Sequence, residues 1–382
     1  METVVQRIER LAPTIVARRE EIETSRRMPA DLVSALRETG ICGMELPRAF
    51  GGRGAEPLEI LQALETLARA DGSTAWCVAQ VLAGNCAAGF MLEAGVREVF
   101  GDPTTPTAGV FAPSGAAIRV EGGVKVTGTW KFGSGIQTAE WIMGGCLVME
   151  TGEPRMTPMG PEAIHVWLPA RSIEIHDTWH VSGLCGTGSH DFSAKDLFVP
   201  DHRVFLIGDP TRACPEPMCR MPVVPWYVAH VAAVSLGVAR TALDEATQVA
   251  QKRVPNFTST VVADQPVAQV ELARAEASLA AARALLHESI MDMWRVVNTS
   301  ESPSLRQVAM ARIAAANATD AGATATRTAS ALGGAGAIYT SSALQRHLRD
   351  AEAITHHFTV ASGVWEDAGR VFMGRKPTAP MF

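Results

Sequence analysis

The stretch that decides the fold is Gly128-Thr-Trp-Lys-Phe-Gly-Ser134-Gly-Ile-Gln-Thr-Ala-Glu-Trp141. β-forming residues occupy 124–132, and a second strand-like run follows at 141–149. Between the two runs, a glycine on each side of Ser134 frees the backbone. The sequence therefore predicts two strands joined by a Ser-Gly turn.

The turn around Ser134 has the features of a platform for a flat ring. An isoalloxazine needs close approach of the backbone, a hydrogen-bonding group near its N5 atom and an aromatic wall. Ser134, its neighbouring amides and Trp130 are predicted to supply these, with Phe132 on the same strand. A Ser-Gly turn between strands is more often only a turn, so the flavin hypothesis needs support from the rest of the chain.

Length and composition limit the classes of function. A chain of 382 residues with 47% hydrophobic and 19% charged residues can bury a large core in two or three layers. The net charge of -6 gives no basic surface, so neither nucleic acid nor a membrane is an expected partner. The most apolar run, 223–239, contains Pro225 and His230 and is too short to span a bilayer, which predicts a buried helix.

Seven cysteines are scattered along the chain without a Cys-x-x-Cys pair, which predicts reduced thiols in a cytoplasmic protein. Cys214 and Cys219 have no histidine nearby in the sequence and are interpreted as surface thiols rather than metal ligands. The spacing of His176 and His180 suits a metal only on a helix, whereas the preceding residues are strand-like. No metal site is predicted.

The chain divides into three parts, at 1–105, 106–208 and 209–382. The predicted helices are an amphipathic opening helix and residues 31–40, 56–70, 73–84, 228–252, 265–297 and 304–332. Short runs of Val, Ile, Thr and Trp predict a β domain at 107–205, and the Pro-rich residues 209–225 predict a linker. The sequence thus predicts an α+β protein whose β domain separates two helical parts.

The long C-terminal helices are Ala-rich and carry a narrow apolar seam. The seam consists of Leu272, Ala275, Leu279, Ala282 and Leu286. Small residues at alternate positions allow close helix packing, so the seam predicts the core of a four-helix bundle. Apolar residues on more than one face of these helices predict subunit contacts and a homo-oligomer.

The order of helices, β domain and helices resembles the acyl-CoA dehydrogenase superfamily across essentially the whole chain. The motifs that carry this resemblance are the Pro-x-x-x-Gly-Gly turn at 46–52, the first bundle helix at 234–247 and a second signature at 332–336 and 345–350. The resemblance implies a central β-barrel or sandwich. It also implies that Gly333, Gly334 and Gly336 approach a flavin phosphate, often across a subunit boundary. Arg253 is expected either to bind that phosphate or to cap its own helix.

Within the superfamily, the chain resembles the oxygenase components of two-component flavin-dependent monooxygenases, which hydroxylate phenols such as p-hydroxyphenylacetate. The segments that carry this second resemblance are 70–76, 130–141, 179–191 and 349–357. In the last segment, His357 falls at the spacing of the catalytic imidazole of these oxygenases. Residues 81–86 lack the substrate-facing histidine of some members, which leaves indolic, polycyclic or other heteroaromatic substrates open.

A missing carboxylate favours the oxygenases over the dehydrogenases. Removal of an α-proton from an acyl thioester needs a carboxylate base. The position after the Arg-Asp signature reads His356-His357-Phe358 instead, with no carboxylate before Glu366, and the start of the first bundle helix holds none. The alternatives are a flavin dehydrogenase or oxidase with its base elsewhere, and a non-catalytic protein with this fold.

The second resemblance implies a mechanism and partners. Reduced FAD or FMN comes from a separate NAD(P)H-dependent flavin reductase and reacts with O2, through a C4a-hydroperoxyflavin kept in a dry cavity, to hydroxylate an aromatic or heteroaromatic molecule. The expected assembly is a cytoplasmic homotetramer. His357 is expected to be the catalytic imidazole, which either removes a proton from a phenol or an indole or helps to stabilise and protonate the flavin peroxide. Ser134 is expected to hydrogen-bond near flavin N5. Further flavin contacts are implied for Thr187, Gly188 and Ser189.

The implied substrate wall consists of Trp76, Trp226, Tyr227 and His230. The same side chains also have structural interpretations. Trp76 is equally expected in the core, and Tyr227 and His230 are somewhat more expected as packing residues. Without the family spacing, His356 and His357 would be interpreted as a hydrogen-bonded pair at an interface.

Overall fold

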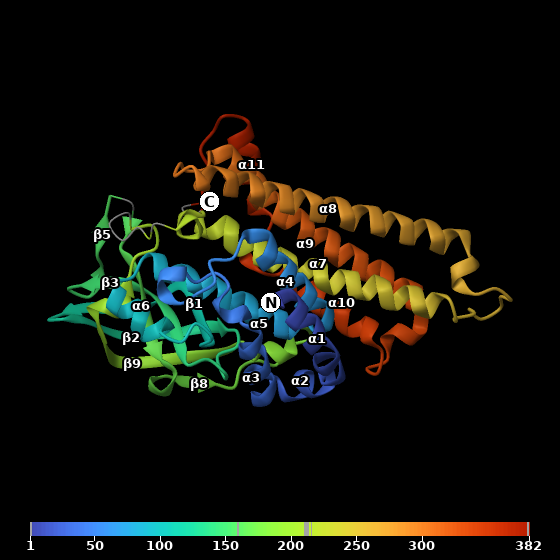
Figure 1. The fold of residues 1–382 in the computed structure, drawn as a ribbon, viewed down its shortest axis with the longest axis horizontal. Helices are drawn as coiled ribbons and strands as arrows, with labels where there is room; N and C mark the ends of the chain where they lie inside the picture. Colours follow the sequence, from blue (N-terminus) through green and yellow to red (C-terminus); the bar gives the residue numbers. More distant parts are fainter. Residues whose placement is uncertain (1, 159, 210–213, 215, 380–381) are drawn as a thin grey trace.

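The structure is a computed structural model that describes residues 2–158, 160–209, 214, 216–379 and 382. Its elements follow the predicted order of helices, β domain and helices (Figure 1). In Figure 1 the β domain occupies one end, the N-terminal helices lie against the middle, and the long C-terminal helices extend to the other end. The α+β architecture predicted from the sequence is confirmed.

The N-terminal part is helical. Its helices are α1 (Val4–Ala17), α2 (Arg19–Ser25), α3 (Ala30–Thr39), α4 (Pro57–Ala70), α5 (Gly72–Asn85) and α6 (Glu93–Phe100). Asp71 begins α5, because its carboxylate accepts hydrogen bonds from the Thr74 amide and hydroxyl, both at 2.7 Å. Nearly every residue of α5 is buried, as expected of a helix that is apolar all round. This central helix positions Trp76 and Gln80.

The expected barrel or sandwich takes the form of one mixed eight-stranded sheet, with a separate two-stranded one, among the described residues. The strands are β1 (Thr107–Val120), β2 (Gly123–Gly133), β3 (Trp141–Glu150), β4 (Glu153–Pro154), β5 (Met156–Thr157), β6 (Gly160–Pro161), β7 (Ala163–Pro169), β8 (Glu174–His176), β9 (His190–Pro200) and β10 (Val204–Phe205). The main order is β10-β7-β3-β1-β2-β9-β8, with β4 on β3 and a parallel β1–β3 pair.

The pairing of β2 with β9 positions the site. The antiparallel register ends with Gly133 opposite His190. The turn after β2 and the residues before β9 therefore meet at the same edge of the sheet, which brings Ser134 beside Ser189. The prediction of two strands joined at Ser134 is confirmed, with β2 and β3 on either side of the turn.

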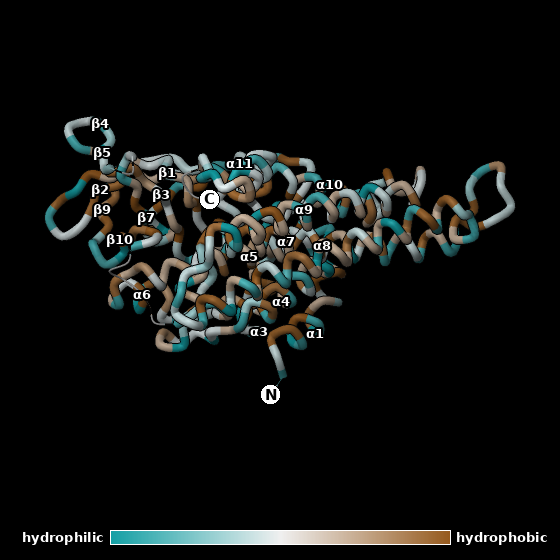
Figure 2. Tube along the Cα trace, turned by 90° about the horizontal axis from the view of Figure 1, so that it is seen from above, coloured by the Kyte–Doolittle hydropathy of each residue, from teal (hydrophilic) through white to brown (hydrophobic). Residues whose placement is uncertain are grey.

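The C-terminal part is a helical bundle. Its helices are α7 (Val223–Ala250), α8 (Pro266–Asn298), α9 (Leu305–Gly333), α10 (Ala343–Thr355) and α11 (Gly363–Phe372). Figure 2 shows brown and teal alternating along the far ends of the long helices, the pattern of helices with one apolar and one polar face. The predicted seam of α8 lies against the core, from partly buried Leu272 to fully buried Leu286.

Helix α7 begins earlier than predicted. The sequence predicts a linker at 209–225, of which residues 210–213 and 215 lie outside the described residues, but α7 starts at Val223. Pro225 is tolerated because amides in the first turn of a helix have no partner within the helix. This helix is long and apolar enough to cross a membrane, because an 18-residue stretch of it has a mean hydropathy of 1.3. However, 83% of that stretch is buried inside the protein. It is therefore a core helix, as predicted.

Candidate active site

Three hydroxyls form a buried chain at the edge of the sheet. The Ser134 and Ser189 oxygens are 2.7 Å apart, as are those of Ser189 and Thr187. Thr187 donates to the Leu184 carbonyl at 2.8 Å, and Trp76 donates its indole N–H to Ser134 at 3.0 Å. Because Thr187 donates to Leu184, Ser189 must donate to Thr187, and Ser134 must donate to Ser189. Ser134 is then left with a free lone pair and no free proton.

Trp76 joins this chain to His357. The two rings meet edge to face, with centroids 5.4 Å apart. His357 Nδ1 lies 2.7 Å from the Thr359 hydroxyl, and Nε2 lies 3.1 Å from the Tyr227 hydroxyl. Tyr227 in turn donates to Gln80 Oε1 at 3.1 Å. We call Ser134, Trp76, Gln80, Tyr227 and His357 the reaction cluster. These residues come from the β2–β3 turn, α5, α7 and the segment after α10.

The hydrogen bonds assign the protons of the reaction cluster. Since Tyr227 donates to Gln80, the Nε2 of His357 carries a proton for the Tyr227 oxygen, and Nδ1 accepts from Thr359. The Gln80 side-chain nitrogen is buried and has no hydrogen-bond partner among the described residues. A buried donor without a hydrogen-bond partner costs free energy unless a ligand accepts its hydrogen bond. The reaction cluster therefore offers a bound molecule one acceptor, Ser134, and one donor, Gln80.

The reaction cluster is uncharged near neutral pH. Burial lowers the pKa of His357 to about 4, and burial raises the pKa of Tyr227 to about 12. No carboxylate contacts Ser134, Trp76, Tyr227 or His357 in the described part of the chain. A neutral imidazole can accept a proton from a substrate. Among the described residues, no carboxylate base contacts these four side chains to remove an α-proton from a thioester.

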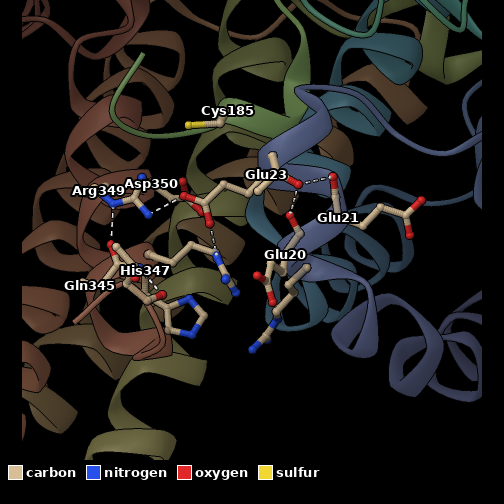
Figure 3. A network of polar contacts seen from close by, with 12 residues as sticks. Glu20, Glu21, Glu23, Cys185, Gln345, His347, Arg349 and Asp350 are labelled. Atoms are coloured by element: carbon tan, nitrogen blue, oxygen red, sulfur yellow. Dashed lines mark hydrogen bonds and ion pairs between the residues drawn. The ribbon is translucent and has the colours of Figure 1, made fainter. Parts of the chain in front are cut away.

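Charged residues lie one layer further out and hold the loop that carries Thr187 and Ser189. Figure 3 shows Glu23 of α2 facing Arg349 of α10, with Asp350 beside it. Asp350 accepts a hydrogen bond from the Leu184 amide at 2.6 Å. Arg349 contacts both Glu23 and the Ser182 carbonyl, and Arg346 pairs with Glu23 at 2.7 Å. We call Glu23, Arg346, Arg349 and Asp350 the anchor network.

The anchor network fixes the loop closely. A Cβ on Gly183 would lie 2.1 Å from the Arg349 carbonyl, so only glycine fits there. Burial raises the pKa of Asp350 to about 7, and the nearby Asp71 carboxylate adds to the rise. Arg346 and Arg349 belong to the second signature at 345–350. The structure places both in ion pairs with Glu23.

One predicted flavin contact is corrected. Trp130 is fully buried, donates to the Gly145 carbonyl at 2.7 Å and stacks on Phe192, so it belongs to the core of the sheet and is no ring wall. Gly188 has a φ of +51°, and a Cβ there would lie 2.5 Å from Gln137 Oε1, so packing alone requires a glycine. Its main-chain contact with the flavin stays a prediction. Phe132, in contrast, is 65% exposed and meets Trp179 edge to face.

Trp226 and His230 lie apart from the reaction cluster. Successive residues of a helix point about 100° apart. Tyr227 therefore reaches His357, while Trp226 and His230 pack against each other, with ring centroids 4.6 Å apart. His230 Nε2 lies 2.7 Å from the Glu45 carboxylate, and both side chains are buried. The expected substrate wall is thus divided between two places.

Arg253 and the predicted glycines form a separate region. Arg253 donates to the Leu332 carbonyl at 3.2 Å, and Gly334, with a φ of +61°, packs its Cα against the guanidinium. A Cβ on Gly333 would meet Leu344, whereas Gly336 faces open space. Figure 1 shows the turn between α9 and α10 beside the bundle, well away from the β domain. Within one chain, this region does not reach Ser134.

Sequence reasoning missed Gln80 and Thr359. Gln80 follows Trp76 by four residues on a predicted helix, so the two share a face. Thr359 follows His357 by two residues, within reach of a local side-chain hydrogen bond. Both spacings were available in the sequence. No cluster of three or more His, Cys, Asp or Glu side chains that could hold a metal occurs in the described part of the protein.

Comparisons with known proteins show which family the chain resembles. Two family models match the chain: Acyl-CoA dehydrogenase, N-terminal domain, over residues 2–99, and Acyl-CoA dehydrogenase, C-terminal domain, over residues 229–362. The chain is 32% identical to indole-3-acetate monooxygenase of Pseudomonas putida, over 94% of this chain and 91% of that relative. It is 30% identical to the flavin-dependent monooxygenase, oxygenase subunit HsaA, of Rhodococcus jostii, over 91% and 92% of the two chains.

Two solved structures share the whole fold. The 3-HSA hydroxylase from Rhodococcus sp. RHA1 matches with a TM-score of 0.92 and 29% identity, over 100% of this chain and 99% of that chain. XiaF from Streptomyces sp., solved in complex with FADH2 and glycerol, matches with a TM-score of 0.91 and 26% identity, over 99% and 96%.

Proposed function

This chain belongs to the flavin-dependent monooxygenases of the acyl-CoA dehydrogenase superfamily, and from this premise we propose the roles of its residues. It is the oxygenase component of a two-component system that hydroxylates an aromatic substrate with reduced flavin and O2. When bound, the flavin supplies the activation of O2. A separate reductase supplies the reduced flavin.

The observation that carries the residue assignment is the free lone pair of Ser134. A reduced flavin has a hydrogen on N5, which is a donor, whereas the N5 of an oxidised flavin is an acceptor. Ser134 donates its hydrogen bond to Ser189 and accepts one from Trp76. Its remaining lone pair can therefore accept from the N5 hydrogen of the reduced form. The unused Gln80 donor lies in the same reaction cluster. Both groups fit a flavin, with exposed Phe132 and the hydroxyls of Thr187 and Ser189 as further supports.

We assign His357 the role of a neutral base beside the substrate. Its low pKa keeps the ring uncharged, so it does not deliver protons to bound oxygen species. It accepts the proton of a phenol or an indole at Nδ1, the ring nitrogen that accepts the hydrogen bond of Thr359. Proton removal raises the electron density of the aromatic ring. Trp76 and Tyr227 line the same space as aromatic walls.

The separate position of Arg253 and Gly334 supports a homotetramer. We propose that this region of one subunit, with Gly333 and Gly336, contacts the phosphates of a flavin held at Ser134 of another. Exposed apolar side chains surround it, among them Ile338 and Tyr339, which are 78% and 68% exposed in the single chain. Native mass spectrometry should show a tetramer, and an active monomer would contradict the assembly.

We also propose a cytoplasmic location without nucleic-acid or membrane partners. All seven cysteines are free thiols, as expected in a reducing compartment. Cell fractionation tests this location.

The experiment that tests the proposed function is oxygen labelling. The protein receives chemically reduced FAD or FMN, 18O2 and a panel of phenols and indoles, including indole, indole-3-acetate and resorcinol. One 18O atom in a hydroxylated product is expected. Quantitative release of hydrogen peroxide with every compound, and no labelled product, would contradict the proposal.

A further inference from the structure

One arginine of the helical bundle is buried beside the segment that carries His357. Arg312 lies on α9 and is only 6% exposed. Its Nη2 donates to the main-chain carbonyl of Thr359 at 3.4 Å. An arginine side chain keeps its charge inside a protein, and a buried charge is costly unless polar groups contact it. The Thr359 carbonyl is one of the groups that stabilise this buried cation.

Thr359 joins Arg312 to the catalytic imidazole. Its carbonyl accepts from Arg312, and its hydroxyl lies 2.7 Å from His357 Nδ1. Thr359 belongs to a single 3-10 turn, Phe358–Val360, which has few hydrogen bonds of its own and depends on its surroundings. Because a β-branched side chain has few rotamers, the hydroxyl follows the orientation of its backbone. A contact that holds the carbonyl therefore also holds the hydroxyl at Nδ1.

Residues that follow α9 in the chain hold Arg312 from its other side. Helix α11 packs against α9 (Figure 1). Asp367 of α11 accepts hydrogen bonds from the Thr378 amide at 2.6 Å and the Ala379 amide at 3.1 Å. The guanidinium carbon of Arg312 lies 5.6 Å from the ring centroid of Phe382, which also packs on the bundle core. Burial lowers the pKa of Arg312, and the negative charge of Asp367 opposes this.

We propose that Arg312 is a positioning residue for His357, which it orients through Thr359, and that Phe382 holds Arg312 in place. The order of contacts is Phe382, Arg312, Thr359 and His357. When the Thr359 carbonyl is released, its hydroxyl turns away from Nδ1, and the imidazole is no longer held in one orientation. This inference rests on the proposed function, because it takes His357 as the base that removes the proton of the substrate.

The first test is NMR of the full chain with 15N-labelled histidine rings, without flavin or substrate. The His357 signals are those lost in His357→Ala, and Thr359→Val shows the effect of losing the hydroxyl at Nδ1. Arg312→Met should shift the Nδ1 signal in the same direction as Thr359→Val, and Arg312→Lys, which keeps a cation, should shift it less. Arg306→Met is the matched control, because Arg306 lies on the same helix, 5.0 Å from the ring of Phe372, and should leave the signal unchanged.

The second test measures the single-turnover rate of hydroxylation with chemically reduced FAD or FMN, O2 and indole, indole-3-acetate or resorcinol. Arg312→Met should lower the rate about five- to tenfold, the effect of one lost hydrogen bond, at unchanged affinity for reduced flavin. Added to Thr359→Val, it should cause no further loss, because both changes remove the same hydrogen bond at Nδ1. Phe382→Leu, which keeps an apolar contact, should lower the rate about twofold.

An unchanged Nδ1 signal in Arg312→Met, or a rate loss that is equally large in the Thr359→Val background, would overturn the inference. Far-UV circular dichroism shows whether Arg312→Met folds. If it does not, Phe382→Leu takes its place in the NMR test, and an unchanged Nδ1 signal there would also overturn the inference.

The NMR test uses neither flavin nor O2, so its outcome is independent of hydroxylation. A shifted Nδ1 signal in a protein that forms no 18O-labelled product would keep the contact of Arg312 with the imidazole and lose the proposed function. Labelled product together with an unchanged signal in Arg312→Met would keep the function and remove Arg312 from the positioning of His357.

Discussion

The reaction cluster and the anchor network contact the same loop and differ in charge. The reaction cluster contains only neutral groups, joined by hydroxyl, indole, amide and imidazole hydrogen bonds. The anchor network contains two arginines and two carboxylates. Both contact residues 182–189, one through Ser189 and the other through Leu184 and Ser182.

The difference shows how the fold combines a firm loop with an uncharged site. Charged hydrogen bonds hold backbone firmly, but charges next to bound oxygen species would supply protons and attract water. Placing the ion pairs behind the loop retains their holding effect and keeps them away from His357. The comparison predicts that changes in the reaction cluster alter chemistry, and that changes in the anchor network alter stability first.

The largest effect is expected from His357→Ala. Loss of a general base typically lowers a rate about 10²- to 10⁴-fold, so hydroxylated product should fall by that factor while hydrogen peroxide release rises. Product and peroxide yields per flavin oxidised measure the change. His356→Ala is the matched control, because His356 is exposed and should keep wild-type yields. A coupled, wild-type yield in His357→Ala would remove the imidazole from the chemistry.

The next effect is expected from Asp350→Ala. The Leu184 amide would lose its buried acceptor, which should cost about 2 to 3 kcal/mol in the free energy of unfolding at pH 6. Urea denaturation measures this cost, and flavin affinity should fall with it as the loop loosens. Asp350→Asn keeps an acceptor oxygen and should retain most of the stability. If Ala and Asn variants are equally stable, the hydrogen bond to Leu184 does not hold the loop.

The pH dependence of stability separates the two regions further. The pKa of Asp350 is raised to about 7 in the folded protein, so its contribution is present at low pH and is lost as the pH rises from about 4 to 7. His357 acts oppositely, because its lowered pKa makes the folded state gain stability as the pH rises from about 4 to 6.5.

Asp350→Asn isolates the first of these contributions, since His357 titrates alike in both proteins. Relative to wild type, the variant should gain roughly 2 kcal/mol of stability between pH 5 and pH 7. Urea denaturation at several pH values measures the difference. A constant difference across that range would mean that Asp350 has an ordinary carboxyl pKa.

The smallest effect is expected from Trp76→Phe, which keeps an aromatic ring and removes the hydrogen bond to Ser134. Without that donor, Ser134 is less firmly oriented, and affinity for reduced flavin should fall by about 1 kcal/mol, or roughly fivefold. Anaerobic titration with reduced flavin measures it. Affinity for oxidised flavin should change less, and an equal loss for both forms would contradict the assigned direction of the hydrogen-bond chain.

Much of the fold followed from local patterns in the sequence. The Ser134 turn, the helix at 73–84 and the apolar seam on α8 depend on residues close together in the chain, and the structure has all three. The resemblance to oxygenases pointed to His357, Ser134, Trp76 and Tyr227, which the fold brings together. Trp130 was wrongly predicted to face a ring, because alternation along a strand does not say which face is covered.

By itself, the sequence determined the order of elements, the turn at Ser134 and the absence of a carboxylate near His357. Each of these depends on short-range backbone preference or on residue identity. Only the tertiary structure decided that Tyr227 faces His357 while His230, on the same helix, contacts Glu45, and that Asp350 holds the loop of Ser189. These contacts join residues more than a hundred positions apart in the chain, and the packing of α5, α7 and α10 against the sheet, rather than any local pattern, sets their distances.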